Sequence, residues 1–151
     1  MPQSLAKIIV HIIFSTKDRV PFLKDETVRR EMHAYLASAF KRLASPAMII
    51  GGAEDHVHIL WIWPRDKEGS KIIGEAKRCS SKWVKDKGGM LGAFQWQKGY
   101  GAFSIGQSQI ETVKEYIRNQ EEHHKRISFQ EEYLAFLKKY GVEYDERYIW
   151  E

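Results

Sequence analysis

Cysteine and long apolar runs are almost missing from this sequence, and each shortage excludes a class of protein. Among 151 residues only Cys79 is a cysteine, so neither a disulfide framework nor a cysteine-based zinc cluster can form within the chain. No apolar run approaches the roughly 18 residues that span a membrane, and the first residues lack the basic-then-apolar plan of a signal peptide. These features predict a protein of the reducing cytoplasm.

The remaining composition is typical of a globular domain. Hydrophobic residues make up 43% and charged residues 29% of the chain. A length of 151 residues suits one domain with its own core. We expect a single domain over residues 1–151, with a core of about 5–128 and a C-terminal helix and tail over 129–151.

Positive charge is concentrated in one segment. The whole chain has a net charge of +4, and residues 71–87 alone hold six basic and two acidic side chains, so the rest of the chain is neutral. A basic stripe of this kind is typical of a surface that binds the phosphate backbone of a nucleic acid. The same pattern occurs on the solvated face of an ordinary helix, and the sequence leaves both interpretations open.

Hydrophobic spacing and turn residues predict the order β-α-β-β-α-β, followed by two more helices. Asp25 and Ser108 are expected helix caps, Gly51-Gly52 a hairpin turn, and residues 98–106 a flexible glycine-rich link. The order is that of a split βαβ, ferredoxin-like antiparallel sheet of the α+β class, with helices on one face plus C-terminal helices. The expected strands are 7–16, 47–50, 54–63 and 94–96, and the expected helices are 26–43, 70–85, 109–124 and 129–140.

The strand over 54–63 carries two histidines, His56 and His58. Successive strand side chains point to opposite faces, so these two share one face and lie one pleat apart. Both can reach a single metal ion, although the same spacing also suits two ordinary half-exposed histidines. His11, inside the apolar strand over 7–16, is better explained as a core histidine with satisfied hydrogen bonds.

The helix over 109–124 adds a second pair of polar side chains. Tyr116 and Gln120 are four residues apart and therefore project from the same face. Two neutral imidazoles and an amide oxygen can hold a divalent cation without cancelling its charge, which leaves the ion able to polarise a phosphodiester. Tyrosine can act as a covalent nucleophile towards such a phosphate. Each side chain alone has an ordinary alternative, Tyr116 in the core or at its rim and Gln120 in solvent.

Several motifs together resemble the single-tyrosine HUH transposases, which include the insertion-sequence-200-like transposases and the REP-associated tyrosine transposases. The resemblance covers nearly the whole chain. It rests on Phe14-Ser15-Thr16-Lys17 with Arg19 and Pro21, Asp55-His56-Val57-His58, Ser80-Ser81-Lys82-Trp83, Trp96-Gln97-Lys98-Gly99-Tyr100 and Tyr116-Ile117-Arg118-Asn119-Gln120.

The resemblance implies a site and a reaction. His56, His58 and Gln120 would bind the metal, Mg²⁺ or Mn²⁺. Tyr116 would cleave single-stranded DNA and leave a 5′-phosphotyrosine, and the 3′-hydroxyl of another strand would then rejoin the DNA. Because the phosphotyrosine retains the energy of the broken phosphodiester bond, the reaction needs no nucleotide hydrolysis. The chain accordingly has no nucleotide-binding loop ending in Gly-Lys-Ser or Gly-Lys-Thr. His124, four residues past Gln120, is a reserve ligand.

The resemblance also implies partners. Members bind single-stranded DNA with subterminal hairpins and act as homodimers with active sites shared between subunits, the tyrosine helix of one chain crossing to the histidines of the other. The flexible glycine-rich link over 99–106 would permit that crossing without requiring it, and no membrane partner is expected. The residues expected to bind DNA phosphates are Lys17, Arg19, Lys71, Arg78, Lys82 and Lys85.

Other functions stay open. A domesticated protein would bind single-stranded DNA hairpins without mobilising activity, and a REP-associated nickase would use the same chemistry. Some relatives, mainly REP-associated ones, carry histidine where this chain has Gln120, so the glutamine favours the insertion-sequence branch. A replication initiator or relaxase is disfavoured because no helicase or second domain is expected in this chain.

Overall fold

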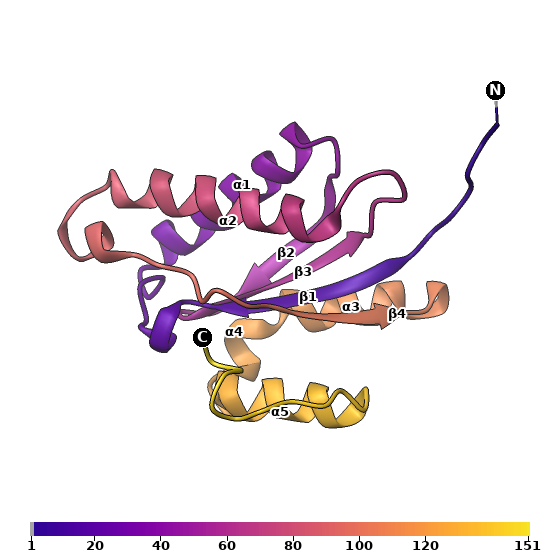
Figure 1. Ribbon diagram of the computed structural model, residues 1–151. Coiled ribbons are helices and arrows are strands. Elements are labelled where there is room, and N and C mark those ends of the chain that lie inside the picture. Colours follow the sequence, from indigo (N-terminus) through magenta and orange to yellow (C-terminus); the bar gives the residue numbers. More distant parts are fainter. Residues whose placement is uncertain (1) are drawn as a thin grey trace.

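A four-stranded antiparallel sheet forms the centre of the protein (Figure 1). The computed structural model describes residues 2–151. The strands lie in the order β2-β3-β1-β4, so the first strand of the chain lies inside the sheet and β4 forms one edge. The strands are β1 (Ile9–Ser15), β2 (Ala47–Gly52), β3 (His56–Ile62) and β4 (Gly101–Ile105).

Helices cover both faces of this sheet. In Figure 1, α1 and α2 lie above it, and α3, α4 and α5 lie below it. This confirms the predicted α+β class, a split βαβ sheet with helices on one face and the C-terminal helices added on the other. The helices are α1 (Glu26–Arg42), α2 (Gly69–Lys85), α3 (Ile110–Arg118), α4 (Gln120–His123) and α5 (Phe129–Lys139), with short 3₁₀ helices over Lys17–Arg19, Gly89–Ala93 and Gln107–Gln109.

The larger apolar core lies between the sheet and the α1–α2 layer. β3 contributes Val57, Ile59 and Trp61, all fully buried. Because side chains alternate along a strand, His56 and His58 point to the other face. Asp25 caps α1, as expected, by accepting a hydrogen bond of 3.0 Å from a backbone N–H of the first turn. The α1–α2 layer therefore stabilises β3 without using its histidines.

Smaller apolar clusters hold the C-terminal helices against the opposite face. Ile13 and Phe103 of the sheet pack against Phe129 and Tyr133 of α5. A Cβ atom at Gly101 would lie 2.9 Å from the Tyr133 ring, so this glycine permits the close approach of α5 to β4. The docking of α5 brings its polar side chains close to the histidines of β3.

Two predicted loops prove to be strands. Gly51 and Gly52 belong to β2, and the hairpin turn lies instead at Ala53–Asp55. Residues 94–96 form only an isolated bridge between Thr16 and Trp96, and the fourth strand, β4, lies inside the link expected to be flexible. The alternation of buried and exposed residues in β4 outweighs the low strand propensity of glycine.

The predicted helix over 109–124 is divided. α3 ends at Arg118, Asn119 has non-helical backbone angles, and α4 begins at Gln120. Ser108 lies in the preceding 3₁₀ helix and does not cap α3. Within residues 2–151, no helix is long and apolar enough to cross a membrane.

Candidate metal centre and active site

β3 presents His56 and His58 to the face covered by the C-terminal helices. Both side chains are fully buried, so they are not the half-exposed histidines of the ordinary alternative. His56 Nδ1 lies 2.7 Å from Asp55 Oδ1, and His58 Nδ1 lies 2.7 Å from His11 Nε2. Since each Nδ1 atom is engaged by a second group, both Nε2 atoms remain for a common ligand, as in many metal-binding histidines.

His11 of β1 contacts the Nδ1 atom of His58, the ring nitrogen that does not face Glu132. Its side chain is only 1% exposed, which confirms the predicted core histidine with a satisfied hydrogen bond. Burial, followed by the neighbouring His58, lowers the pKa of His11 well below its usual value, so its ring is neutral. When His58 donates its Nδ1 hydrogen to His11, the lone pair of His58 Nε2 is free for a metal. His11 therefore orients a predicted ligand.

Gln120 reaches the same site from the start of α4. It is fully buried, and its Oε1 atom lies 3.1 Å from His56 Nε2. Its Nε2 atom donates to the backbone oxygen of Tyr116 at 3.4 Å and to Glu132 Oε2 at 3.3 Å, which fixes the orientation of the amide. The break at Asn119 thus leaves Gln120 on the side of the histidines.

Tyr116 lies beside the histidines of its own chain. Its ring centroid is 5.8 Å from that of His58 and 6.1 Å from that of His11. Its hydroxyl lies 3.3 Å from His123 Nε2 and donates a hydrogen bond to Glu132. One chain therefore brings together all four residues expected at the site: His56, His58, Tyr116 and Gln120.

Glu132 of α5 lies at the centre of this cluster and was missed by the sequence analysis. Its side chain is 2% exposed. The Oε1 atom lies 2.9 Å from His58 Nε2 and 3.0 Å from His124 Nε2, while Oε2 accepts the hydrogen bond from the Tyr116 hydroxyl. A single carboxylate therefore joins the tyrosine to the histidines.

The sequence did contain a signal for Glu132. In α5 the apolar residues Phe129, Tyr133, Phe136 and Leu137 recur with helical spacing and mark the face that packs on the sheet. Glu132 falls within this stripe, three residues after Phe129 and four before Phe136. An acidic residue in an apolar stripe is buried, and a buried carboxylate requires polar or cationic partners.

The ionisation states follow from burial and contacts. Burial, and then the charge of Glu132, raise the pKa of Tyr116 above its usual range, so the phenol keeps its proton. Burial alone would raise the pKa of Glu132, but His58 and His124 outweigh it and hold that pKa well below its usual value. Burial lowers the pKa of His58 to about 4 despite the opposing carboxylate. The site contains an ionised acid and a protonated phenol.

The donor set fits a divalent metal. His56, His58, His124 and Glu132 each offer an atom, and these atoms all lie within 4.8 Å of one another. In the tautomer in which His56 donates from Nδ1 to Asp55, its Nε2 lone pair faces the acceptor oxygen of Gln120. Two acceptors in contact require a cation or a proton to satisfy them. His124, the reserve ligand of the sequence analysis, lies in the cluster.

Cavities border the cluster on two sides. One, of about 590 Å³, is lined by Asp55, His124 and the basic side chains of Arg29, Lys125 and Arg126. The second, of about 230 Å³, is lined by Tyr116, Glu132, His123, Phe136 and Lys139 among others. Tyr116, Glu132 and His124 thus line these cavities, whereas His56, His58 and Gln120 are fully buried behind them.

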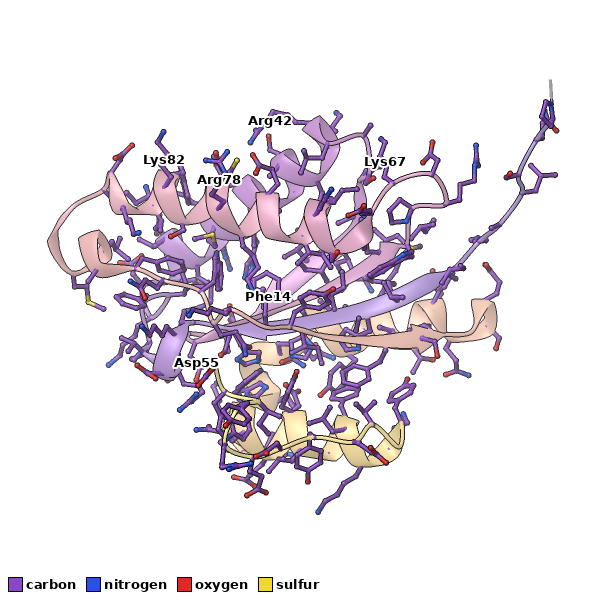
Figure 2. All side chains as sticks on the ribbon, viewed as in Figure 1. Phe14, Arg42, Asp55, Lys67, Arg78 and Lys82 are labelled. Atoms are coloured by element: carbon purple, nitrogen blue, oxygen red, sulfur yellow. The ribbon has the colours of Figure 1, made fainter. Side chains whose placement is uncertain are left out.

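The basic side chains of α2 lie on the opposite side of the sheet. Figure 2 shows Arg78 and Lys82 on the outer surface of this helix, with Asp55 at the far side of the sheet. Lys71 pairs with Glu68, the residue just before α2, and Arg78 pairs with Glu75 within the helix. Lys85 lines a groove of about 410 Å³ between α2 and residues 95–98. A DNA strand that contacts both α2 and Tyr116 must therefore pass around an edge of the sheet.

Lys17 and Arg19 lie nearer to the cluster, in the 3₁₀ helix that follows β1. The Arg19 guanidinium is 5.4 Å from the centroid of the Trp150 ring. Trp150 also packs near Phe129, whose ring centroid is 5.0 Å from that of His56. The C-terminal tail is thus packed beside the face of the sheet that carries His56 and His58.

Comparison with known proteins tests the family of this chain. The family described as "Transposase IS200 like" matches residues 4–120, well over half of the sequence. The chain belongs to this family. The match confirms the resemblance drawn from the motifs, and it includes His56, His58, Tyr116 and Gln120. Glu132, on α5, lies beyond the matched segment of this transposase.

Two solved structures share the fold of the transposase. A candidate transposase from Deinococcus radiodurans R1 is 20% identical, with a TM-score of 0.62, and the alignment covers 80% of this chain and 96% of that one. A REP-associated tyrosine transposase bound to a REP hairpin is 14% identical, with a TM-score of 0.60 and coverage of 84% and 74%. At these identities the likeness establishes the fold alone. None of the curated proteins compared with this chain matches it.

Proposed function

We propose that this transposase cleaves and rejoins single-stranded DNA through a 5′-phosphotyrosine at Tyr116. The observation that carries the proposal is the carboxylate of Glu132, whose two oxygens contact the Tyr116 hydroxyl and His58 Nε2. The nucleophile and the metal-binding histidines are therefore separated by the width of one carboxylate. A scissile phosphate needs the same placement, with the attacking oxygen on one side and a cation on another.

The reaction exchanges one phosphate ester for another. The Tyr116 oxygen attacks phosphorus, the bond to the 3′ oxygen breaks, and the released strand ends in a 3′-hydroxyl. The phenol must lose its proton as it attacks, and Glu132 Oε2 already accepts the hydrogen bond of that proton. A 3′-hydroxyl of a second strand then attacks the phosphotyrosine, which restores a DNA linkage and returns the phenol without nucleotide hydrolysis.

The metal of this reaction would be Mg²⁺ or Mn²⁺, held by His56, His58 and Gln120. When bound, it supplies a Lewis acid that polarises a phosphate oxygen. Asp55 orients His56, and His11 orients His58, each through a contact of 2.7 Å. The protein therefore fixes both rings before DNA arrives, which reduces the entropic cost of assembling the site.

A DNA hairpin is the substrate we expect. One of the two structural neighbours is bound to a REP hairpin, and this supports the expectation. Arg29, Lys125 and Arg126 line the cavity beside His124, where they can contact backbone phosphates. More distant phosphates would bind the basic residues of the sequence analysis: Lys17, Arg19, Lys71, Arg78, Lys82 and Lys85.

A covalent-adduct experiment tests the proposed chemistry. The protein is incubated with a labelled single-stranded hairpin and a divalent metal, and the adduct is detected by denaturing electrophoresis. Tyr116→Phe should abolish the adduct while hairpin binding stays within a few-fold of the parent, because only one oxygen is removed. Tyr148→Phe, at a side chain that is 59% exposed, is the matched control and should form the adduct normally. An adduct on the Tyr116→Phe protein would refute the assignment.

The shared-site homodimer stays a prediction. The described chain completes the cluster by itself, and the link expected to be flexible is strand β4, so the geometry favours a site built within one chain. Mixing the His56→Ala, His58→Ala protein with Tyr116→Phe, with subunit exchange confirmed by mass spectrometry, distinguishes the two arrangements. Shared sites should restore roughly a quarter of the parent's cleavage, since about half the dimers are mixed. Sites built within one chain should restore none.

A further inference from the structure

We propose that Glu132 is a further direct ligand of the metal, beside His56, His58 and Gln120, and that this centre prefers Mn²⁺ to Mg²⁺. The inference rests on the metal-dependent function proposed above and extends it. Glu132 lies on α5, beyond the family match over residues 4–120, so family membership does not assign it this role.

The first observation is the lack of a fixed positive charge at a buried carboxylate. Glu132 is 2% exposed, and its hydrogen-bond partners within residues 2–151 are two imidazoles, a phenol and an amide. Buried charges in proteins are normally paired with an opposite charge or coordinate a metal. No lysine or arginine among the described residues forms an ion pair with Glu132, so a metal cation would supply the missing charge.

The second observation is the spacing of the atoms. Glu132 Oε1 lies 2.9 Å from His58 Nε2, 3.0 Å from His124 Nε2 and 3.7 Å from His56 Nε2. Adjacent ligand atoms around an octahedral ion with bonds of ~2.1 Å are about 3.0 Å apart. The carboxylate oxygen therefore already has the spacing of a neighbouring ligand from the nitrogens of His58 and His124, whereas the His56 nitrogen is about 0.7 Å farther away than that spacing.

The third observation is that His58 can offer a lone pair to a metal without losing its partners. Glu132 accepts a hydrogen bond from His58 when Nε2 carries the hydrogen. When His58 instead donates from Nδ1 to the neutral His11, its Nε2 lone pair faces Glu132 Oε1, and a shared cation satisfies both atoms. The second oxygen of the carboxylate remains bound to Tyr116, so the same side chain sets the distance between metal and nucleophile.

The ligand set determines the preferred metal. Mg²⁺ favours a nearly regular shell of oxygen atoms and retains several waters. Imidazole nitrogens favour divalent transition-metal ions, of which Mn²⁺ is one, over Mg²⁺. Sites that mix imidazole and carboxylate ligands are typical of transition metals. With two or three imidazoles beside one carboxylate, this centre should select Mn²⁺ over Mg²⁺.

Electron paramagnetic resonance tests the inference without DNA, because free Mn²⁺ gives a six-line signal that decreases on binding. We expect Glu132→Gln to weaken Mn²⁺ binding at least tenfold, since the variant keeps the shape but loses the charge. Glu131→Gln, at the exposed neighbouring position of α5, should bind as the parent does. In competition, the parent should bind Mn²⁺ at least tenfold more tightly than Mg²⁺.

Crystals of the parent grown with Mn²⁺ give a second measurement that does not depend on a variant folding. The anomalous peak should lie within bonding distance of Glu132, His56 and His58. A peak bound by His56, His58 and Gln120 with Glu132 turned away would overturn the inference, as would unchanged Mn²⁺ affinity in Glu132→Gln or a preference for Mg²⁺. Failure of the proposed DNA chemistry is detected separately, by loss of the Tyr116 adduct, because neither metal measurement uses DNA.

Discussion

Gly51 is the position where a single methyl group should displace Tyr116, the proposed nucleophile. It lies in β2, paired with His58 of β3, and faces α3. A Cβ atom at this position would lie 2.5 Å from the backbone oxygen of Ile117, whereas ordinary contacts begin at 3.4 Å. Because the atom it meets belongs to the backbone, α3 must move by about 0.9 Å, the difference between these two distances. Tyr116 is the preceding residue and moves with it.

Gly51→Ala should lower both the rate of catalysis and the stability of the fold. A misplacement of ~1 Å can reduce a rate by roughly 100-fold, because the attacking oxygen loses its alignment with phosphorus. Overpacking of this kind costs about 1–3 kcal/mol. For a chain of this size that corresponds to a decrease of about 2–12 °C in melting temperature. The rate is measured as single-turnover formation of the Tyr116 adduct, and stability by thermal melting.

Gly74→Ala is the matched control for this substitution. Gly74 lies in α2, on the other side of the sheet, and an added Cβ would have no atom within 4 Å. Alanine inside a helix should stabilise the protein by about 0.5–1 kcal/mol and leave the adduct rate unchanged. If Gly51→Ala also kept the adduct rate within twofold of the parent and the same melting temperature, the argument that α3 is held by this contact would be refuted.

Three further experiments test His11, Lys77 and the basic surface of α2. His11→Leu should weaken Mn²⁺ binding by roughly 10–100-fold, because it removes the partner of His58 Nδ1, whereas His11→Gln should keep most of the affinity; equal losses would exclude a specific hydrogen bond. Burial lowers the pKa of Lys77 from 10.5 to about 8, so between these pH values the unfolded chain holds a proton that the folded chain has released, and stability should rise with pH across that window. Denaturant unfolding should show a rise about 3 kcal/mol larger for the parent than for Lys77→Met, and parallel pH curves would contradict the buried lysine. Reversing Lys82 and Lys85 to glutamate should weaken hairpin binding and flatten its dependence on salt, while an unchanged slope would exclude phosphate contacts by α2.

Local patterns predicted much of the fold because they depend on short-range rules. The order β-α-β-β-α-β, the cap at Asp25 and the helix over Phe129–Lys139 follow from spacing and capping chemistry that act within a few residues. The errors arose where packing outweighed propensity. The glycine-rich segment Gly101–Ile105 became an edge strand because β1 offers it a complete set of hydrogen-bond partners, and Phe103 then packs under α5.

The candidate site, like the fold, was predicted from the sequence only where local patterns decide the structure. The sequence by itself determined that His56 and His58 share one face of a strand, and it identified Tyr116 and Gln120 as the candidate nucleophile and ligand, because strand alternation and motif spacing are local. Only the tertiary structure decided that Glu132 lies between them, 74 residues from His58 along the chain, and that α2 lies on the opposite face of the sheet. These contacts between residues far apart in the sequence depend on how α5 docks on β4 and β1. The docking is set by the combined packing of distant apolar side chains, so it cannot be derived from any short stretch of sequence.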